Sequence, residues 1–394
     1  MRFATRPVPS LPSETRAAAV AQPAMDAREA VAKLGRVAAG IFPMDGLSCE
    51  VDSVPAAAWD KLASEFDDLN YDQIACYSAG QWGERVSHLL LRRQGEPIAG
   101  ARIAIVTLPG FKRGLAFLRF GPFWRHRGRA ADLDVYRAAI AALVEEYCVR
   151  RGHCLTVIPR PNPEFYKQES QVLSDFGFSV RRRVPDPNRY LVDLSLDEEA
   201  QMRSLDQKWR YNLRQALAND FDIRLCESEA DVRTFQSLHA TMVTRKGFYN
   251  ADMVHLLPDL AAQLPEASRP RIALAFHQGR AVVGATVALL GDTAYYVFGG
   301  SDSAALSLKG GYALQWWIIR WLSTQKVRWY DLGGEAQEPG LRQFKKGLVG
   351  KRGAVVSMTG EYDHWTQTSG RLMGDAIYGL RGLQRSIRHW RYGT

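Results

Sequence analysis

The stretches HLLLRRQGEPIAGARIAIV (residues 88–106) and RIALAFHQGRAVVGATVALL (residues 271–290) resemble each other and decide the fold. Each begins with an apolar run, turns at Gly95 or Gly279, and continues into a second apolar run. Two apolar runs joined by a short turn that contains glycine predict a β-hairpin with one buried face. The sequence therefore predicts the same hairpin twice, once in each half of the chain.

The likeness between the two halves continues downstream of the hairpins. Each hairpin is followed by a predicted strand, a helix of apolar period and a short strand. These cover residues 114–124, 135–152 and 154–158 in the first half, and residues 293–301, 312–325 and 327–332 in the second. Agreement across successive elements indicates an internal repeat. The expected fold class is α+β, with two tandem mixed αβ domains and a C-terminal helix.

Composition and proline-rich connectors suggest where the domains begin and end. We expect a flexible leader over residues 1–45, a first domain over 46–195 and a second over 196–353. Residues 354–394 are expected to hold a strand that returns to the first domain and a basic helix. Further helices are predicted over residues 197–218 and 229–244.

The composition indicates a globular protein with a polyanionic partner. The 394 residues carry a formal net charge of +9, which favours nucleic acid, a phosphorylated substrate or an anionic membrane. The five cysteines are scattered, so neither a metal site nor a disulfide framework is expected. No run approaches the roughly 18 apolar residues of a membrane span. We expect a cytoplasmic monomer, with peripheral association at the inner membrane as an open alternative.

Motifs for several common reactions are absent from the sequence. There is no G-x-x-x-x-G-K-[ST] loop, no G-x-S-x-G elbow and no H-E-x-x-H helix. The αβ unit is compatible with acyl transfer on the N-acetyltransferase (GNAT) fold. That fold holds its donor between two splayed strands, beside a helix N-terminus. In the second copy SLKGGYAL (residues 307–314) stands where the usual CoA-binding loop would be, but its glycine spacing differs. No cofactor is therefore expected.

Several segments of the second half together carry a recognisable pattern. They are KWRYNLRQAL (208–217), FQSLHATMVTRKGFY (235–249), YVFGGS (296–301), YDLGG (330–334), GLRQFKKGLVG (340–350) and GEYD (360–363). The chain resembles the FemABX family, which transfers amino acids from aminoacyl-tRNA to peptidoglycan precursors. The resemblance covers roughly residues 70–363 and implies two GNAT-like domains.

The resemblance implies three catalytic positions. Phe344 and Lys345 fall on the family's Phe-Lys pair, whose lysine stabilises negative charge at the reacting ester carbonyl or on the tRNA end. Aminolysis of an ester passes through a tetrahedral oxyanion, which a fixed ammonium stabilises. Glu361 matches an acidic position at the domain junction, where it either orients the acceptor amine or pairs with a basic neighbour.

Substrate-binding positions follow in the same way. Arg245 and Tyr249 match a pair that grips the diphosphate of a UDP-linked precursor, and at i and i+4 they share a helix face. Tyr296 and Phe298 match two tyrosines near the acceptor and, two residues apart on a strand, are expected on one side of the sheet. In the first copy, a segment starting at Tyr71 places Trp82 and Arg85 on the family's aromatic and cation. The family's arginine of an R-G-P motif is replaced by Phe120.

Two basic helices are candidates for polyanion binding. Lys208, Arg210, Arg214 and also Lys346 are expected to contact the tRNA backbone in a salt-sensitive way. The C-terminal helix combines arginines with an apolar set at helical spacing. It could bind tRNA, lie on an anionic membrane, or dock its apolar face on the body.

The sequence thus predicts an aminoacyltransferase with aminoacyl-tRNA as co-substrate and a UDP-linked or lipid-linked peptidoglycan precursor as acceptor. Two alternatives remain open. One is a CoA-dependent GNAT-type N-acyltransferase, supplied with acetyl-CoA or another acyl-CoA, that acts on a sugar or polysaccharide precursor. The other is a non-catalytic relative that binds tRNA or membrane.

Overall fold

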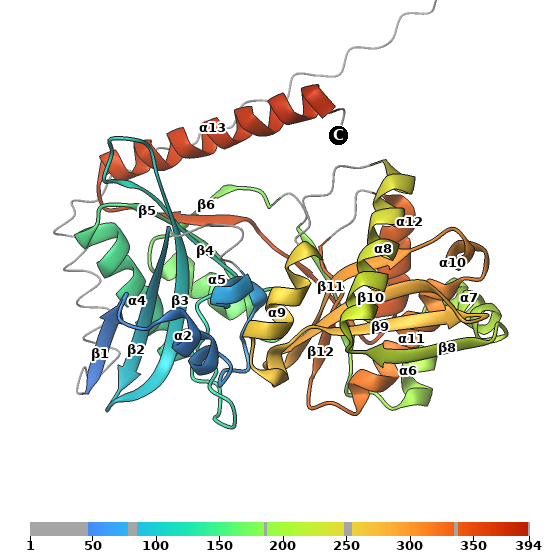
Figure 1. Ribbon diagram of the computed structural model, residues 1–394. Coiled ribbons are helices and arrows are strands. Elements are labelled where there is room, and N and C mark those ends of the chain that lie inside the picture. The colour runs from blue at the N-terminus through green and yellow to red at the C-terminus, as the bar shows by residue number, and fades with distance from the viewer. Residues whose placement is uncertain (1–45, 78–84, 185–186, 248–253, 335–337, 393–394) are drawn as a thin grey trace, which may run out of the picture.

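The computed structural model describes residues 46–77, 85–184, 187–247, 254–334 and 338–392, with side chains up to residue 381. Within these ranges the chain forms two seven-stranded mixed sheets that lie side by side (Figure 1). No helix of the described part is long and apolar enough to cross a bilayer.

The first sheet has the strand order β1-β2-β3-β4-β5-β14-β6. Its strands are β1 (Leu47–Val51), β2 (Val86–Arg93), β3 (Glu96–Thr107), β4 (Gly114–Arg119), β5 (Cys154–Ile158), β6 (Ser179–Arg182) and β14 (Glu361–His364). Its helices are α2 (Ala56–Ala63), α4 (Leu133–Leu143) and α5 (Tyr166–Asp175), and α4 continues as a π-helical segment, Val144–Arg150.

The second sheet has the order β13-β7-β12-β11-β10-β9-β8. Its strands are β7 (Asn188–Asp193), β8 (Phe221–Cys226), β9 (Arg271–His277), β10 (Arg280–Leu290), β11 (Thr293–Ser301), β12 (Trp329–Asp331) and β13 (Ala354–Ser357). Its helices are α6 (Glu198–Ser204), α7 (Gln207–Leu217), α8 (Glu229–Lys246), α9 (Leu257–Gln263), α10 (Ala304–Ser307), α11 (Gly310–Ser323) and α12 (Pro339–Val349).

The predicted repeat is confirmed strand by strand. The hairpins β2–β3 and β9–β10 are antiparallel, and the strand after each hairpin pairs in parallel with the strand that follows the next helix. When the two strand orders are read from β1 and from β8, the strands correspond one to one. In the same comparison α4 takes the place of α11 in the chain, and α5 takes the place of α12. Two mixed αβ units of one topology therefore lie in tandem.

One strand near the end of each sheet comes from outside the half that forms the rest of it, which corrects the expected assignment of two strands. β7 lies within the predicted first domain but pairs with β12 of the second sheet. β13 was expected to return to the first sheet but pairs with β7, and the returning strand is β14, which inserts between β5 and β6. The exchange satisfies the backbone groups of both sheets with strands supplied by the neighbouring half.

Local chemistry explains where the helices begin. The predicted helix over residues 197–218 is two helices, because Asp206 accepts a hydrogen bond from the Lys208 amide and starts α7 anew after α6. α8 begins with a capping box between Ser228 and Asp231 and ends at Gly247, whose φ of 66° suits glycine. The helices α5 and α12 were not predicted.

A charged contact and an apolar cluster join the two halves. Asp292, in the turn between β10 and β11, accepts hydrogen bonds from Arg125 (2.7 Å) and from the buried Arg160 (2.6 Å) of the first half. Trp59 and Phe66 of the first half pack in one cluster with Leu260 and Tyr295 of the second. Burial alone would raise the pKa of Asp292, but the charges of Arg160 and Arg125 hold it at about 2.

We predict that Asp292→Ala lowers the free energy of unfolding by about 3–5 kcal/mol at neutral pH, because it leaves Arg160 buried without its carboxylate. Since the pKa of Asp292 is lowered from 3.8 to about 2, the pair stabilises the fold above pH 3.8 and ceases to do so as the pH falls through 2. The difference in the free energy of unfolding between wild type and variant, measured in urea, should therefore shrink as the pH is lowered from 3.8 to 2. Asp222→Ala, at an exposed pair with Arg224, is the control and should cost less than about 1 kcal/mol.

Candidate functional site

The second sheet opens where β11 and β12 part. The two strands pair only from Thr293 to Tyr295, and β11 then continues to Ser301 beside β10 alone. The chain after β12 follows β7 instead, since the Leu332 amide donates to the Tyr190 carbonyl at 2.8 Å. In the first sheet β4 and β5 stay paired to their ends, through Arg119 and Ile158. The second half therefore has the splayed strands that the first half lacks.

Asp331 shapes the turn at this opening. One carboxylate oxygen accepts from buried Arg189 of β7 at 2.7 Å, and the other accepts from the Gly333 amide at 2.8 Å. Gly333 has a φ of 87°, a conformation that glycine adopts without strain. The Tyr-Asp-Leu-Gly-Gly motif therefore encodes a turn with a fixed shape.

Lys345 reaches this turn from α12. Its Nζ donates to the Gly334 carbonyl at 2.9 Å, and the side chain is half-buried. A Cβ at Gly333 would lie 3.6 Å from the same Nζ. The ammonium of Lys345 is thus held just beyond the end of β12, one of the two strands that part.

Phe344 points elsewhere. Its ring lies 4.9 Å from that of Tyr312 and 5.6 Å from that of Trp209, and these three aromatics join α12, α11 and α7. A small pocket beside them is also lined by Lys208, Asn212 and Gln343. In this structure Phe344 fixes the helix that carries Lys345.

Tyr296 and Phe298 lie on opposite faces of the sheet, so the expectation of one shared side is wrong. A β-bulge shifts the register between Thr286 and Val287, which puts Val287 opposite Tyr296 and Thr286 opposite Phe298. Tyr296 packs on the face that carries α7, α11 and α12, whereas buried Phe298 packs under α8 beside His239. Tyr296 is the first residue of β11 beyond its pairing with β12, so it lies at the opening.

Arg245 lies at the far end of the same strand. Its guanidinium donates to the Ser301 hydroxyl at 3.1 Å, and the side chain is exposed at the end of α8. The adjacent Lys246 pairs with Glu338 at 2.9 Å, which joins the end of α8 to the start of α12. Tyr249 lies outside the described residues, so its predicted partnership with Arg245 stays a prediction.

Glu361 lies at the junction between the two halves. It opens β14, opposite Arg182 of β6. Asp72, and more weakly Glu361, raise the pKa of Arg119. Glu361 thus belongs to a charged group on the first sheet, whereas Lys345 lies on the second.

Arg119 was missed by the sequence reasoning. It is the last residue of β4, its Nε lies 3.6 Å from a carboxylate oxygen of Asp72, and its side chain is 41% exposed. Its guanidinium lies 4.8 Å from the centre of the Phe120 ring, and buried Arg189 lies 5.4 Å from the same ring. An arginine guanidinium thus lies beside the Phe120 ring, one residue before the position at which the resemblance expects an arginine.

The remaining predicted contacts are dispersed. Arg85 is exposed just before β2, and Trp82 falls outside the described residues. Lys208, Arg214 and Lys346 are exposed, on α7 and α12. Arg210 instead donates to the backbone carbonyls of Arg203 (3.1 Å) and Leu205 (2.5 Å) and so fixes the break between α6 and α7.

The N-terminus of α11 is covered by α7. Lys309, with a φ of 57°, precedes this helix and donates to Asn212 at 2.7 Å. The side chain of Asn212 in turn donates to the Tyr312 hydroxyl at 3.1 Å, and that of Asn219 donates to the Leu308 carbonyl at 3.1 Å. In a GNAT domain this is the helix end that receives donor phosphates. In this chain the loop just before α11 is instead bonded to α7 through Lys309.

Comparisons with known proteins agree with this architecture. Residues 203–346 match the family described as acetyltransferase (GNAT) domain. The crystal structure of FemX is similar with a TM-score of 0.66 and 14% identity, over 82% of this chain and 99% of that chain. The C-terminal domain of a proposed lysylphosphatidylglycerol synthetase from Agrobacterium fabrum is similar with a TM-score of 0.54 and 13% identity, over 83% and 96% of the two chains.

A conserved protein of unknown function from Bacteroides thetaiotaomicron is similar as well, with a TM-score of 0.54 and 11% identity over 80% of this chain and 99% of that chain. No curated protein matches the sequence. The fold is therefore two tandem GNAT-like domains, as predicted. The GNAT match lies in the second half and includes Arg245, Tyr296 and Lys345.

We predict that Gly299→Ala displaces Tyr296, because a Cβ at position 299 would lie 1.7 Å from the Tyr296 hydroxyl oxygen. Urea unfolding should show a loss of about 1 kcal/mol, which becomes smaller in a Tyr296→Ala background since the clash is then gone. Gly311→Ala, where a Cβ meets nothing within 4 Å, is the matched control. Equal losses in both backgrounds would show that the two residues are not in contact.

Proposed function

We propose that this protein is an acyltransferase that moves an amino acid from aminoacyl-tRNA to an amine of a peptidoglycan precursor. The observation that carries the proposal is the ammonium of Lys345, held by the Gly334 carbonyl just beyond β12, one of the two strands that part. GNAT-type folds place the acyl donor between such splayed strands. An ester carbonyl in that position would lie within the field of a fixed positive charge.

The proposed reaction is aminolysis of an ester. The acceptor amine attacks the aminoacyl carbonyl, a C–N bond forms, and the carbonyl oxygen becomes an oxyanion that Lys345 stabilises. The C–O bond to the terminal ribose then breaks, and the proton lost by the amine ends on the departing ribose oxygen. The new amide and the free tRNA are the products, and atoms balance without any other reactant.

Two features support tRNA as the donor in preference to an acyl-CoA. Exposed Lys208 and Arg214 on α7, together with Lys346 on α12, present cations on neighbouring helices. Such cations suit a phosphate backbone, with little dependence on base sequence. The loop that would accept the CoA diphosphate instead bonds to Asn212 of α7 through Lys309, and to Asn219, just after α7, through the Leu308 carbonyl.

The acceptor is expected to be anionic. Arg245 ends α8 beside Ser301, and the part-exposed Arg119 lies at the junction of the two halves. A guanidinium binds phosphate oxygens through two parallel hydrogen bonds, so either arginine suits a diphosphate-linked precursor. The similar structure from Agrobacterium fabrum is described as the C-terminal domain of a proposed lysylphosphatidylglycerol synthetase, and phosphatidylglycerol is an anionic lipid. That description supports amino acid transfer to an anionic acceptor.

The direct test is to incubate the protein with a pool of charged tRNAs and with UDP-linked or lipid-linked precursors, and to detect the mass gain of the acceptor. Gain that requires charged tRNA is the expected result. Turnover of an acyl-CoA without tRNA would replace the proposal by CoA-dependent acylation. Binding without turnover of either donor would indicate a non-catalytic relative.

We predict that Lys345→Ala lowers the rate of transfer by about 100- to 1000-fold, the usual effect of removing one oxyanion-stabilising group. The amide-forming rate at saturating tRNA measures this directly. Lys351→Ala, an exposed lysine in the turn that follows α12, is the control and should transfer at the wild-type rate. A Lys345→Ala variant as active as the control would remove Lys345 from the mechanism.

We predict that the double variant Lys208→Glu/Arg214→Glu weakens tRNA binding for all tRNAs alike. The slope of log affinity against log salt concentration should fall by about 2, because two phosphates are no longer neutralised by the protein. Filter binding across a salt series measures the slope. Arg224→Glu/Arg233→Glu reverses two exposed arginines on β8 and α8 and serves as the matched control. An unchanged slope in the first variant would place the tRNA elsewhere.

A further inference from the structure

The C-terminal helix α13 (Thr368–Tyr392) is docked on the first sheet by one face only. It packs against β4 and β5, and Ile377 is buried. A Cβ at Gly370 would lie 2.5 Å from the Gly152 carbonyl oxygen, and one at Gly374 would lie 2.9 Å from the Cβ of Cys154. The helix therefore approaches residues 152–154 so closely that only glycine fits at these two positions. Asp375 adds ion pairs with Arg181 and Arg182 of β6.

The opposite face of α13 carries exposed leucines. Leu372 is 58% exposed and Leu380 is 48% exposed, although both are large apolar side chains. With Ala376 they form a row spaced by four residues, and the sequence continues that row at Leu383, Ile387 and Trp390. On the face that contains the buried Ile377, residues at the same spacing further along the helix are Arg381, Arg385 and Arg388. The apolar row of this amphipathic helix therefore lies on a different face from the one that packs against the sheet.

The charge of this helix is strongly positive. Residues 368–392 contain five arginines and one acidic residue, Asp375, which is already paired with Arg181 and Arg182 of β6. Figure 1 shows the C-terminal half of α13 projecting beyond the first sheet. An apolar row on a cationic helix is typical of a segment that lies on an anionic bilayer.

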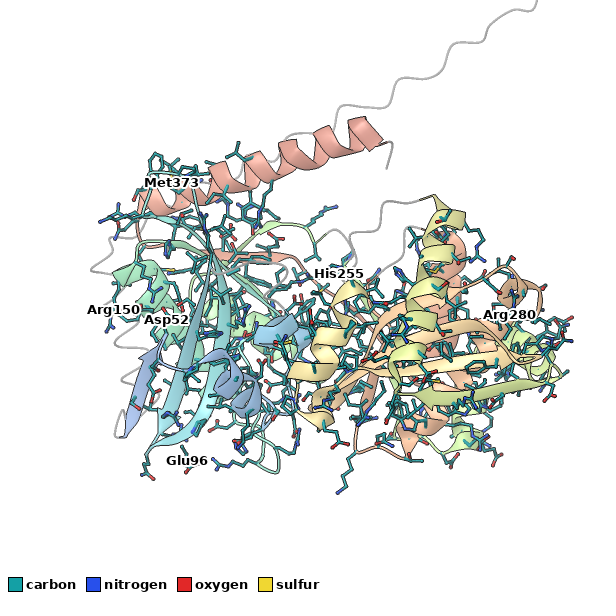
Figure 2. All side chains as sticks on the ribbon, viewed as in Figure 1. Asp52, Glu96, Arg150, His255, Arg280 and Met373 are labelled. Atoms are coloured by element: carbon teal, nitrogen blue, oxygen red, sulfur yellow. The ribbon has the colours of Figure 1, made fainter. Side chains whose placement is uncertain are left out.

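Another exposed apolar residue lies beside the start of α13. Phe111, in the turn between β3 and β4, is 55% exposed and is followed by the exposed Lys112 and Arg113. Arg113 donates to the Ser369 hydroxyl at 2.7 Å, which ties the turn to the first residues of the helix. Figure 1 shows this turn rising to the level of α13, and Figure 2 shows the side chains around Met373 at the same end of the helix. An aromatic side chain next to two cations suits the interface between lipid headgroups and acyl chains.

We propose that α13 and the Phe111 turn form a binding surface for an anionic lipid bilayer, with Leu372, Leu380 and Phe111 entering the headgroup region. Positive charge matches the phosphates of the headgroups, and the leucine row supplies the apolar contact. This surface lies on the first half, whereas Lys345 lies on the second. The proposal therefore stands or falls independently of the transfer reaction.

The test is sedimentation of the full chain with vesicles of phosphatidylcholine that contain about one third phosphatidylglycerol. Binding is expected to these vesicles and not to pure phosphatidylcholine, and it should weaken as salt screens the arginines. The double variant Leu372→Glu/Leu380→Glu should bind at least about tenfold more weakly, and Phe111→Ser should show a smaller loss. Circular dichroism and urea unfolding would verify that each variant folds.

The matched control is Leu217→Glu/Leu306→Glu, which changes two leucines that are 54% and 62% exposed on α7 and α10. It should sediment like the wild type. Equal binding to both kinds of vesicle, no binding, or unchanged binding by Leu372→Glu/Leu380→Glu would overturn the proposal. Loss of RNA binding or of a dimer in that variant, with vesicle binding intact, would assign the leucine row to another partner.

Discussion

The carboxylate of Asp331 is the group on which the rest of the site depends. It ends β12, pairs with Arg189 of β7, and accepts the Gly333 amide, so one side chain determines where the strand stops and how the chain turns. The turn presents the Gly334 carbonyl to Lys345. Both Arg189 and Asp331 are buried, so removing either leaves a charge without its partner in a poorly solvated place. The position of the Lys345 ammonium is thus coupled to the strand β7, which comes from the connector between the halves.

The exchange of strands makes the two halves one structural unit while leaving them unequal. β7 completes the second sheet and β14 completes the first, so neither sheet is closed by its own half alone. In the first half β4 and β5 remain paired to their ends. In the second half a bulge at Val297 lies two residues beyond Tyr295, the last residue of β11 that pairs with β12. Bulges bend and twist a strand, which accounts for the opening at this point. Both halves therefore share the same topology, but only the second half has parted strands.

The hairpins, the repeat and the C-terminal helix were predicted from the sequence because each rests on local periodicity. Pairings between distant segments were not predicted, because the placement of β7 and β14 depends on which sheet has an unpaired strand edge beside them. The same limit explains the site. Lys345, Arg245 and Tyr296 were predicted through a motif, and the structure places Lys345 just beyond β12, Tyr296 at the opening and Arg245 at the far end of β11. Phe298 was assigned to the wrong face because a β-bulge leaves no trace in the alternation of apolar and polar residues. Arg119 was passed over because the motif expects its arginine at position 120, directly before Gly121 and Pro122.

The role of Asp331 in positioning Lys345 is tested most directly by a double-mutant cycle on the rate of amino acid transfer, with Asp331→Asn and Lys345→Ala made singly and together. If Asp331 acts by holding the turn that positions Lys345, the double variant should be hardly slower than Lys345→Ala alone, because both changes remove the same stabilisation of the oxyanion. Rate losses that multiply would contradict this coupling and would mean that Asp331 and Lys345 act separately.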